Sequence, residues 1–179
     1  MTTHVSDRIK LHVAAWAVGG IALTFVEAIA RLGLRGWRAV EGGLSGPQWL
    51  ALVGMTLALG YFEGHRALQR RFAPDVVARA LELAGQPITA RSWLAPLHAT
   101  SLLGSDRAAL ARAWLAVAAI AGAVAIVRAL PDPWRAIIDL AVASALAWGL
   151  VALLVKFAEA TRLGASARPR EHVIADIQP

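Results

Sequence analysis

Histidine and carboxylate side chains are the groups of this chain best suited to bind a metal ion or to move a proton. His12, Glu63, His65 and His98 supply three imidazoles and one carboxylate, and Arg66 adds a neighbouring cation. Two histidines and a carboxylate can bind Zn²⁺ or Fe²⁺, and the same groups serve as general acids and bases. These residues come from separate segments, however, without the paired histidines of a helical zinc motif. We therefore predict no metal and no cofactor, and we expect the five residues to form a hydrogen-bonded inner polar cluster.

The spacing of Glu63 and His65 also argues against a shared ligand. Residues two positions apart on a regular α-helix lie about 200° apart around its axis, so the two side chains are expected on opposite faces. Glu63 falls on the same face as Gly60, and we expect this face to turn toward the rest of the fold. Arg70 and Arg71 follow on the same segment, where guanidinium groups are expected to contact lipid headgroups.

A second charged set lies near the other ends of the apolar segments. Glu27 and Asp139 are carboxylates within apolar segments, and Arg31, Arg128 and Arg135 lie close to the same ends. Charges inside apolar spans are rare and indicate either function or pairing, and Glu27 and Arg31 have the spacing of a helical ion pair. We predict that these five residues form an outer ion-pair cluster. A vestibule for cations or protons is the alternative.

Four long apolar segments must position these groups. The chain has 179 residues, of which 58% are apolar, and a mean hydropathy of +0.56, whereas soluble proteins are about 45–50% apolar. A transmembrane helix needs about 20 apolar residues. We predict an all-α polytopic integral membrane protein, a bundle of four transmembrane helices in a single membrane domain, 1–179. The spans are expected at about 11–32, 47–70, 107–130 and 134–160.

The segment between spans 2 and 3, about 73–105, is predicted to hold one or two interfacial amphipathic helices. Ala73-Pro74 is expected to end the preceding span, and Pro96 interrupts the second part of the connector. Residues 164–179 are polar and are predicted to form a flexible tail. The apolar residues that recur at helical spacing in the first part of the connector are Val76, Val77, Ala80, Leu81 and Ala84.

The distribution of charge predicts the orientation of the chain. Most of its 18 lysines and arginines follow span 2 or lie near the two termini. Because positive residues concentrate in cytoplasmic segments, we expect both termini in the cytoplasm and the chain in an inner or plasma membrane. The net charge of +6 comes from arginines that flank apolar spans, which is typical of contact with a lipid bilayer and not with nucleic acid.

Small residues and missing catalytic motifs decide the functional prediction. Alanine fills much of 116–125, and Gly60 and Gly64 are four residues apart, a spacing that lets helices approach closely in lipid. The sequence contains no nucleophile elbow and no phosphate-binding loop. We predict a non-enzymatic protein that acts by assembly, as a homo-oligomeric channel or transporter unit or as a subunit of a larger membrane complex.

Two alternatives stay open. One is a membrane-interface enzyme or binding protein for a lipid- or quinone-like molecule. In that case Glu63 or His98 is the acid–base group, and the arginines at 66, 70 and 71 hold a headgroup. The other is a surface scaffold that recruits a cytoplasmic partner through the connector Asp75–Ser105.

Overall fold

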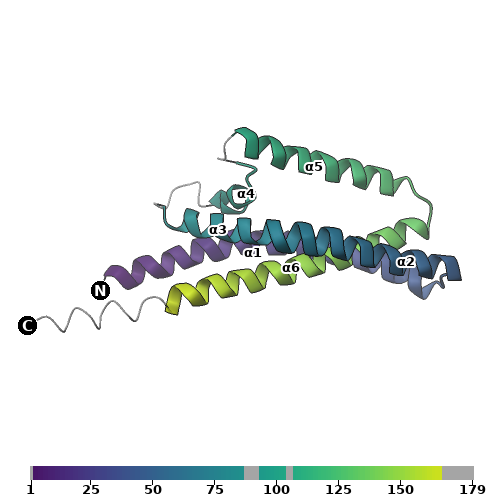
Figure 1. The fold of residues 1–179 in the computed structure, drawn as a ribbon, viewed down its shortest axis with the longest axis horizontal. Helices are drawn as coiled ribbons and strands as arrows, with labels where there is room; N and C mark the ends of the chain where they lie inside the picture. The colour runs from purple at the N-terminus through teal and green to yellow at the C-terminus, as the bar shows by residue number, and fades with distance from the viewer. Residues whose placement is uncertain (1, 87–92, 104–106, 167–179) are drawn as a thin grey trace, which may run out of the picture.

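A computed structural model describes residues 2–86, 93–103 and 107–166, and among these residues there are helices and no strands. The all-α prediction is confirmed. In chain order the elements are α1 (Thr2–Glu41), α2 (Gly46–Leu59), the π-helix η1 (Gly60–Phe72), α3 (Ala73–Ala84), α4 (Ala95–Ala99), α5 (Arg107–Arg128) and α6 (Trp134–Ser166) (Figure 1).

Within the described residues, three helices are long and apolar enough to cross a membrane. They are Lys10–Glu41 of α1, Arg107–Arg128, which is α5, and Trp134–Arg162 of α6. They correspond to the first, third and fourth predicted spans. The second predicted span falls on α2, which has 14 residues, and on the polar η1, and so it does not meet the same criteria of length and apolarity.

The segments α2, η1 and α3 form one unbroken helical rod. Phe72 and Ala73 keep right-handed helical dihedral angles at the junction of η1 and α3, so the predicted stop at Ala73-Pro74 is wrong. Pro74 stands at the start of α3, and because proline has no N–H, one carbonyl of the preceding turn in η1 lacks its helical hydrogen bond while the rod continues.

The two longest helices extend beyond their predicted ends. α1 has 40 residues and is about 60 Å long at 1.5 Å per residue, which is twice the hydrocarbon thickness of a bilayer. Its last turns carry Arg35 and Gly36, both of which contact α6. α6 continues to Ser166, so the first three residues of the predicted flexible tail are helical. The rest of that tail lies outside the described residues.

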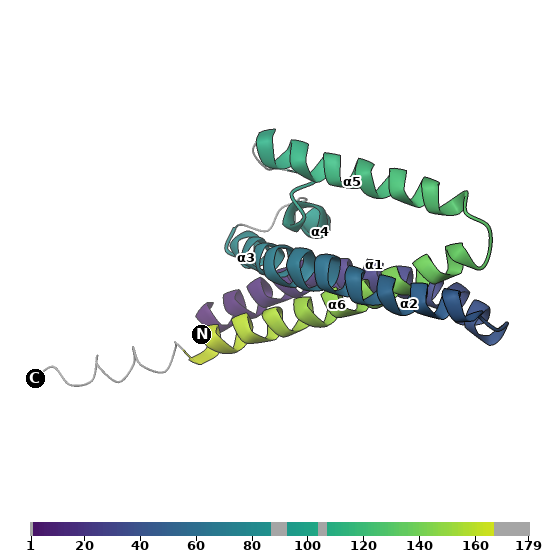
Figure 2. The ribbon, with the colours of Figure 1, turned by 45° about the vertical axis from the view of Figure 1, so that its right-hand side comes forward.

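The long helices run roughly along one axis (Figures 1 and 2). α1, α6 and the α2–η1–α3 rod are side by side (Figures 1 and 2), and the start of α1 and the end of α6 are at the same end of the molecule (Figure 1). α5 stands apart from the others and comes near α6 at the turn that joins them. None of the residues 107–128, all of which the structure describes, is buried. α5 is therefore an apolar helix that takes no part in the packed core.

The packed core lies toward the end where α1 begins. It joins one face of α1 to α3, α4 and Leu153 of α6. The connector helix α3 contributes its apolar face, except for Leu81, which is exposed, and this face is therefore occupied within the chain. The buried apolar residues of α3 that the sequence predicts are Val76, Val77, Ala80 and Ala84.

Close backbone approach fixes α1 against α6 at the opposite end. A Cβ built on Gly36 would lie 2.5 Å from the Cβ of Leu140 and 3.0 Å from the Ala136 carbonyl oxygen, whereas a Cβ on Gly33 would meet nothing within 4 Å. Only glycine fits such a contact, and small residues are what allow apolar helices to pack tightly in lipid.

Candidate functional site

The structure distributes the inner polar cluster over three elements. His12 is exposed on α1, and His98 lies on α4, where its Nδ1 is 3.0 Å from a backbone carbonyl oxygen of its own turn. Glu63, His65 and Arg66 lie together on η1. Among the residues that the structure describes, no group of three or more His, Asp or Glu side chains could hold a metal ion. Three of the five predicted residues are thus together on η1, which makes this segment the candidate site.

Glycines bring η1 against α6. A Cβ built on Gly64 would lie 3.2 Å from the Cβ of Trp148, and one built on Gly149 would lie 2.9 Å from the Cβ of Leu68. Gly64 is buried, whereas its neighbour Glu63 is exposed. The expectation that Glu63 turns toward the bundle is therefore wrong, because the glycine face makes the close contact.

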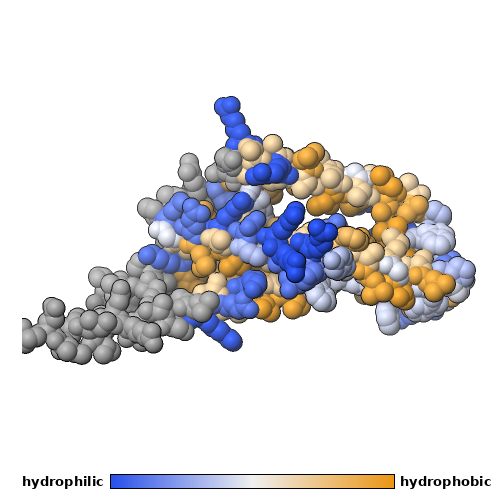
Figure 3. Space-filling view, viewed as in Figure 1, coloured by the Kyte–Doolittle hydropathy of each residue, from blue (hydrophilic) through white to orange (hydrophobic). Residues whose placement is uncertain are grey.

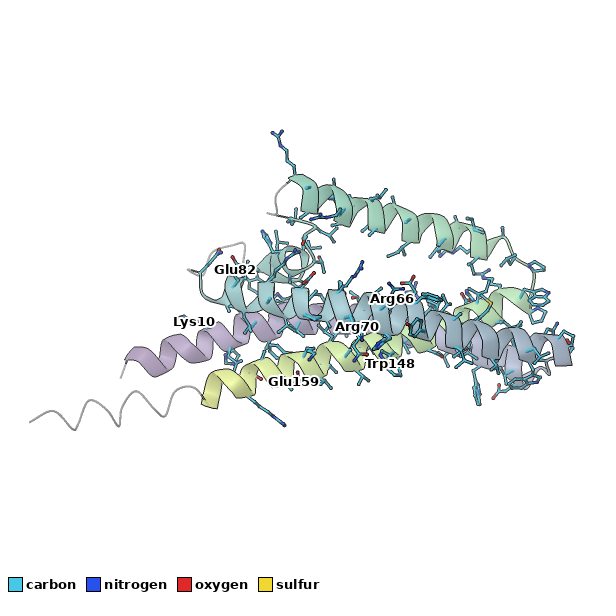
Figure 4. All side chains as sticks on the ribbon, viewed as in Figure 1. Lys10, Arg66, Arg70, Glu82, Trp148 and Glu159 are labelled. Atoms are coloured by element: carbon cyan, nitrogen blue, oxygen red, sulfur yellow. The ribbon has the colours of Figure 1, made fainter. Side chains whose placement is uncertain are left out.

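Hydrophilic side chains gather at mid-length of the molecule, over η1, and apolar side chains cover much of α2 and α5 (Figure 3). Trp148, which η1 contacts, is the midpoint of the apolar segment Trp134–Arg162 of α6. Arg66, Arg70 and Trp148 lie in the same middle stretch, while Lys10 lies toward the end where α1 begins (Figure 4). The charged residues of η1 are therefore level with the centre of a helix that is apolar enough to cross a membrane.

Gln69 links His65 of η1 to Trp148 of α6. The Trp148 Nε1 donates a hydrogen bond of 2.7 Å to Gln69 Oε1, and His65 Nδ1 lies 2.9 Å from the same oxygen. Because an amide oxygen is an acceptor only, the His65 ring carries a proton on Nδ1. The ring also stacks on Tyr61, with the ring centroids 6.0 Å apart. His65 is thus held as a hydrogen-bond donor at the contact between η1 and α6.

The winding of η1 brings together side chains that an α-helix would separate. Phe62 and Arg71 are nine residues apart, which places them on opposite sides of a helix with 3.6 residues per turn. In a π-helix the hydrogen bonds run from i to i+5, so residues four or five positions apart lie above one another. Phe62, Arg66, Ala67 and Arg71 accordingly line one open depression of about 200 Å³.

The surface around this depression is basic. Arg66, Arg70 and Arg71 are all exposed, and so is the single carboxylate of the segment, Glu63. Phe62 forms the apolar wall, and its ring meets Tyr61 edge-on with centroids 5.2 Å apart. Two guanidinium groups beside an aromatic ring suit an anion that carries an apolar part.

The outer ion-pair cluster separates into two groups. Asp139 is buried on α6, accepts a hydrogen bond of 3.3 Å from Nη1 of Arg35 on α1, and lies 4.0 Å from Nε of Arg135. Glu27 and Arg31 pair with each other on the exposed surface of α1. Asp139 thus joins α1 to α6, whereas the Glu27–Arg31 pair lies within one helix.

Arg35 is the partner that the sequence does not predict. The predicted span 1 ends at residue 32, which leaves Arg35 in a connector, whereas α1 continues to Glu41. The indole of Trp37 donates a 2.8 Å hydrogen bond to Glu41, and this i, i+4 spacing is the local signal that the helix continues. Arg128 lies exposed at the end of α5.

No protein-family model matches this sequence, and comparison with the curated proteins and with the solved structures found no match. The functional conclusion therefore rests on the geometry of the chain itself.

Proposed function

We propose that this chain is a membrane protein of four spans that acts by assembling with copies of itself into a channel or transporter unit. The spans are α1, α2 with η1, α5 and α6, with both termini in the cytoplasm, in an inner or plasma membrane. The observation that carries the proposal is α5, a 22-residue apolar helix without a buried residue over the whole of its described length.

The composition of α5 favours a helix partner over lipid alone. Alanine and glycine make up most of 116–125. Between helices in a bilayer the attraction comes from close packing, and small residues at the interface allow it. Because α1, α6 and the rod already pack with one another, a second copy of the chain is the partner available to α5.

The charges of η1 favour a water-accessible space in the assembly. Charged side chains at mid-membrane are costly, and they occur where they face a bundle interior or a water-filled cavity. The exposed Arg66, Arg70 and Arg71 lie level with the midpoint of α6. A partner copy that encloses this surface would form a water-filled space around the arginines, which lipid cannot provide. Such a space is a feature of a channel or transporter unit.

The two other functions receive less support. α3 has its apolar face occupied by α1 and α4, so it offers a cytoplasmic partner mainly polar residues. Of the two alternative acid–base groups, Glu63 is exposed on η1, and His98 on α4 has its Nδ1 at a backbone carbonyl oxygen.

Cysteine cross-linking in native membranes tests the assembly, because the chain has no cysteine of its own. Single cysteines are placed at each position of 116–125, with Leu50→Cys and Leu57→Cys on α2 as controls, since both are exposed. We expect disulfide-linked dimers at α5 positions three or four residues apart, and none at the controls. Uniform cross-linking at every position, or none on α5, would contradict the proposal.

The mass of the particle in a lipid nanodisc gives an independent measure. We expect more than one copy of the chain per particle. A single copy per nanodisc, at protein concentrations at which the cross-links form, would show that the cross-links report random collisions.

A further inference from the structure

We propose that the depression on η1 binds a phosphate group, carried either by a lipid or by a free anion. The site is built from Phe62, Arg66, Ala67 and Arg71, which line one open volume of about 200 Å³. It does not depend on whether copies of the chain assemble, because all four side chains come from one segment of one chain.

The chemistry of the lining selects an anion. A guanidinium group presents a planar fork of N–H donors that matches two oxygens of a phosphate or carboxylate. Arg66 and Arg71 place two such forks on one depression, and each is exposed and able to reach a ligand. A tetrahedral phosphate offers oxygens to both forks at once, whereas a single carboxylate satisfies one of them. Phosphate is therefore the better match.

The geometry of η1 places the two arginines on the same depression. On a regular α-helix, residues five positions apart are about 140° apart around the axis, which would turn Arg71 away from Arg66. The i to i+5 hydrogen bonding of η1 instead places them one above the other. π-helical segments are uncommon, and they are frequent at functional sites.

Neighbouring rings hold the apolar wall of the site in place. His65 is fixed by its contact with Gln69 and stacks on Tyr61, and Tyr61 in turn meets Phe62 edge-on. An aromatic ring beside two arginines suits the junction between a phosphate and an apolar chain. The experiment below separates the two sources, a phospholipid and free phosphate.

Ligand binding is measured on the full chain in neutral detergent after delipidation, by native mass spectrometry. The probes are phosphatidylglycerol, phosphatidylcholine and inorganic phosphate. For the double variant Arg66→Gln/Arg71→Gln we expect the affinity for phosphatidylglycerol to fall at least about tenfold, because two charge-assisted contacts are lost. For Arg66→Lys/Arg71→Lys we expect a smaller loss, of about threefold to tenfold, since charge remains but the fork does not.

A control variant removes the same charge elsewhere. Arg38→Gln/Arg112→Gln alters two exposed arginines on α1 and α5, and we expect its affinity to stay within about twofold of the unaltered chain. Ala67→Leu keeps every charge and fills the depression, so it is expected to weaken binding if the cavity is the site. Size-exclusion profiles and melting temperatures establish that each variant is folded.

The outcomes are distinct. Phosphatidylglycerol that resists displacement by millimolar inorganic phosphate identifies the lipid as the source. Binding of inorganic phosphate with the same dependence on Arg66 and Arg71 identifies the free anion, and both results support the site. Equal losses in the site variant and the control variant, or no loss in folded Arg66→Gln/Arg71→Gln, would overturn the proposal.

Discussion

Two charged regions contact α6, and the fold accommodates them in opposite ways. Asp139, near the start of α6, is buried and bonded to Arg35 from α1. At the midpoint of α6, the charged segment η1 presents Gly64 and Gln69 to Trp148 and leaves its arginines exposed. The difference indicates that a charge is buried in this fold where another helix supplies its partner. The arginines of η1 that lack such a partner stay exposed, where a ligand or a second chain can reach them.

Removal of the buried carboxylate of Asp139 tests the first region. Of all the substitutions, it is expected to lower the free energy of unfolding the most. In Asp139→Asn, the guanidinium groups of Arg35 and Arg135 lose their counter-charge. Asp139 is buried, but the side chains of Arg35 and Arg135 that lose their partner are 46% and 26% exposed. The cost should therefore lie between that of an exposed pair, less than about 1 kcal/mol, and that of a fully buried pair broken from one side, about 3–5 kcal/mol. The free energy of unfolding, measured by denaturant titration in detergent micelles, should fall by an amount of this order.

The exposed pair on α1 provides the matched control. Glu27→Gln removes a carboxylate whose side chain is 66% exposed and whose partner, Arg31, is one turn away. Exposed pairs of this kind contribute less than about 1 kcal/mol. If Glu27→Gln and Asp139→Asn cost the same, burial would not distinguish the two carboxylates, and the comparison would fail.

The next largest loss of stability is expected where Gly36 of α1 contacts α6 beside Asp139. In Gly36→Ala the added methyl group meets Leu140 and the backbone oxygen of Ala136, and overpacking of this kind typically costs about 1–3 kcal/mol. Gly33→Ala is one turn away on the same helix and meets nothing. Alanine in place of glycine within a helix should leave its stability unchanged or raise it by up to about 1 kcal/mol. Thermal melting of both variants is the measurement, and a lower melting temperature for Gly33→Ala than for Gly36→Ala would be inconsistent with the packing.

The smallest effect is expected at the contact between η1 and α6. Trp148→Phe removes the indole donor to Gln69 Oε1, while His65 remains to satisfy that oxygen. Loss of one such hydrogen bond costs about 0.5–1.5 kcal/mol. Trp114→Phe, an exposed tryptophan on α5, should change the free energy of unfolding by less. A double-mutant cycle with Gln69→Leu measures the coupling, and additive losses would show that the hydrogen bond does not stabilise the contact.

Local patterns were sufficient to predict part of this fold. The apolar runs predicted α1, α5 and α6, and helical spacing predicted the buried face of α3, because both features are properties of short stretches of sequence. The end of α1 was not predicted, because the apolar run stops near residue 30 while the helix continues through polar residues to Glu41. Arg35 was missed as a partner of Asp139 for that reason.

The site on η1 depends on a feature that the sequence pattern does not contain. A spacing of 3.6 residues per turn separates Phe62 from Arg71, and only the wider winding of η1 places both on one depression. The signal closest to it in the sequence is Gly64, whose spacing to Gly60 indicates a helix contact without indicating how the helix winds. Arg70 and Arg71 remain predicted headgroup contacts, and Arg71 is the one that lines the depression.

The central claim is that η1 turns its charged face to a polar space inside the membrane. The water accessibility of two residues at the same level of the molecule tests it most directly. Arg70 is exposed on η1, and Val151 is 61% exposed on α6, close to the contact between Gly149 and Leu68. Single cysteines at these positions are treated in intact membranes with a charged, water-soluble thiol reagent. We predict fast modification of Arg70→Cys and none of Val151→Cys, as expected if η1 faces the proposed polar space and this face of α6 faces lipid. Equal modification of both cysteines, or protection of Arg70→Cys, would contradict the account.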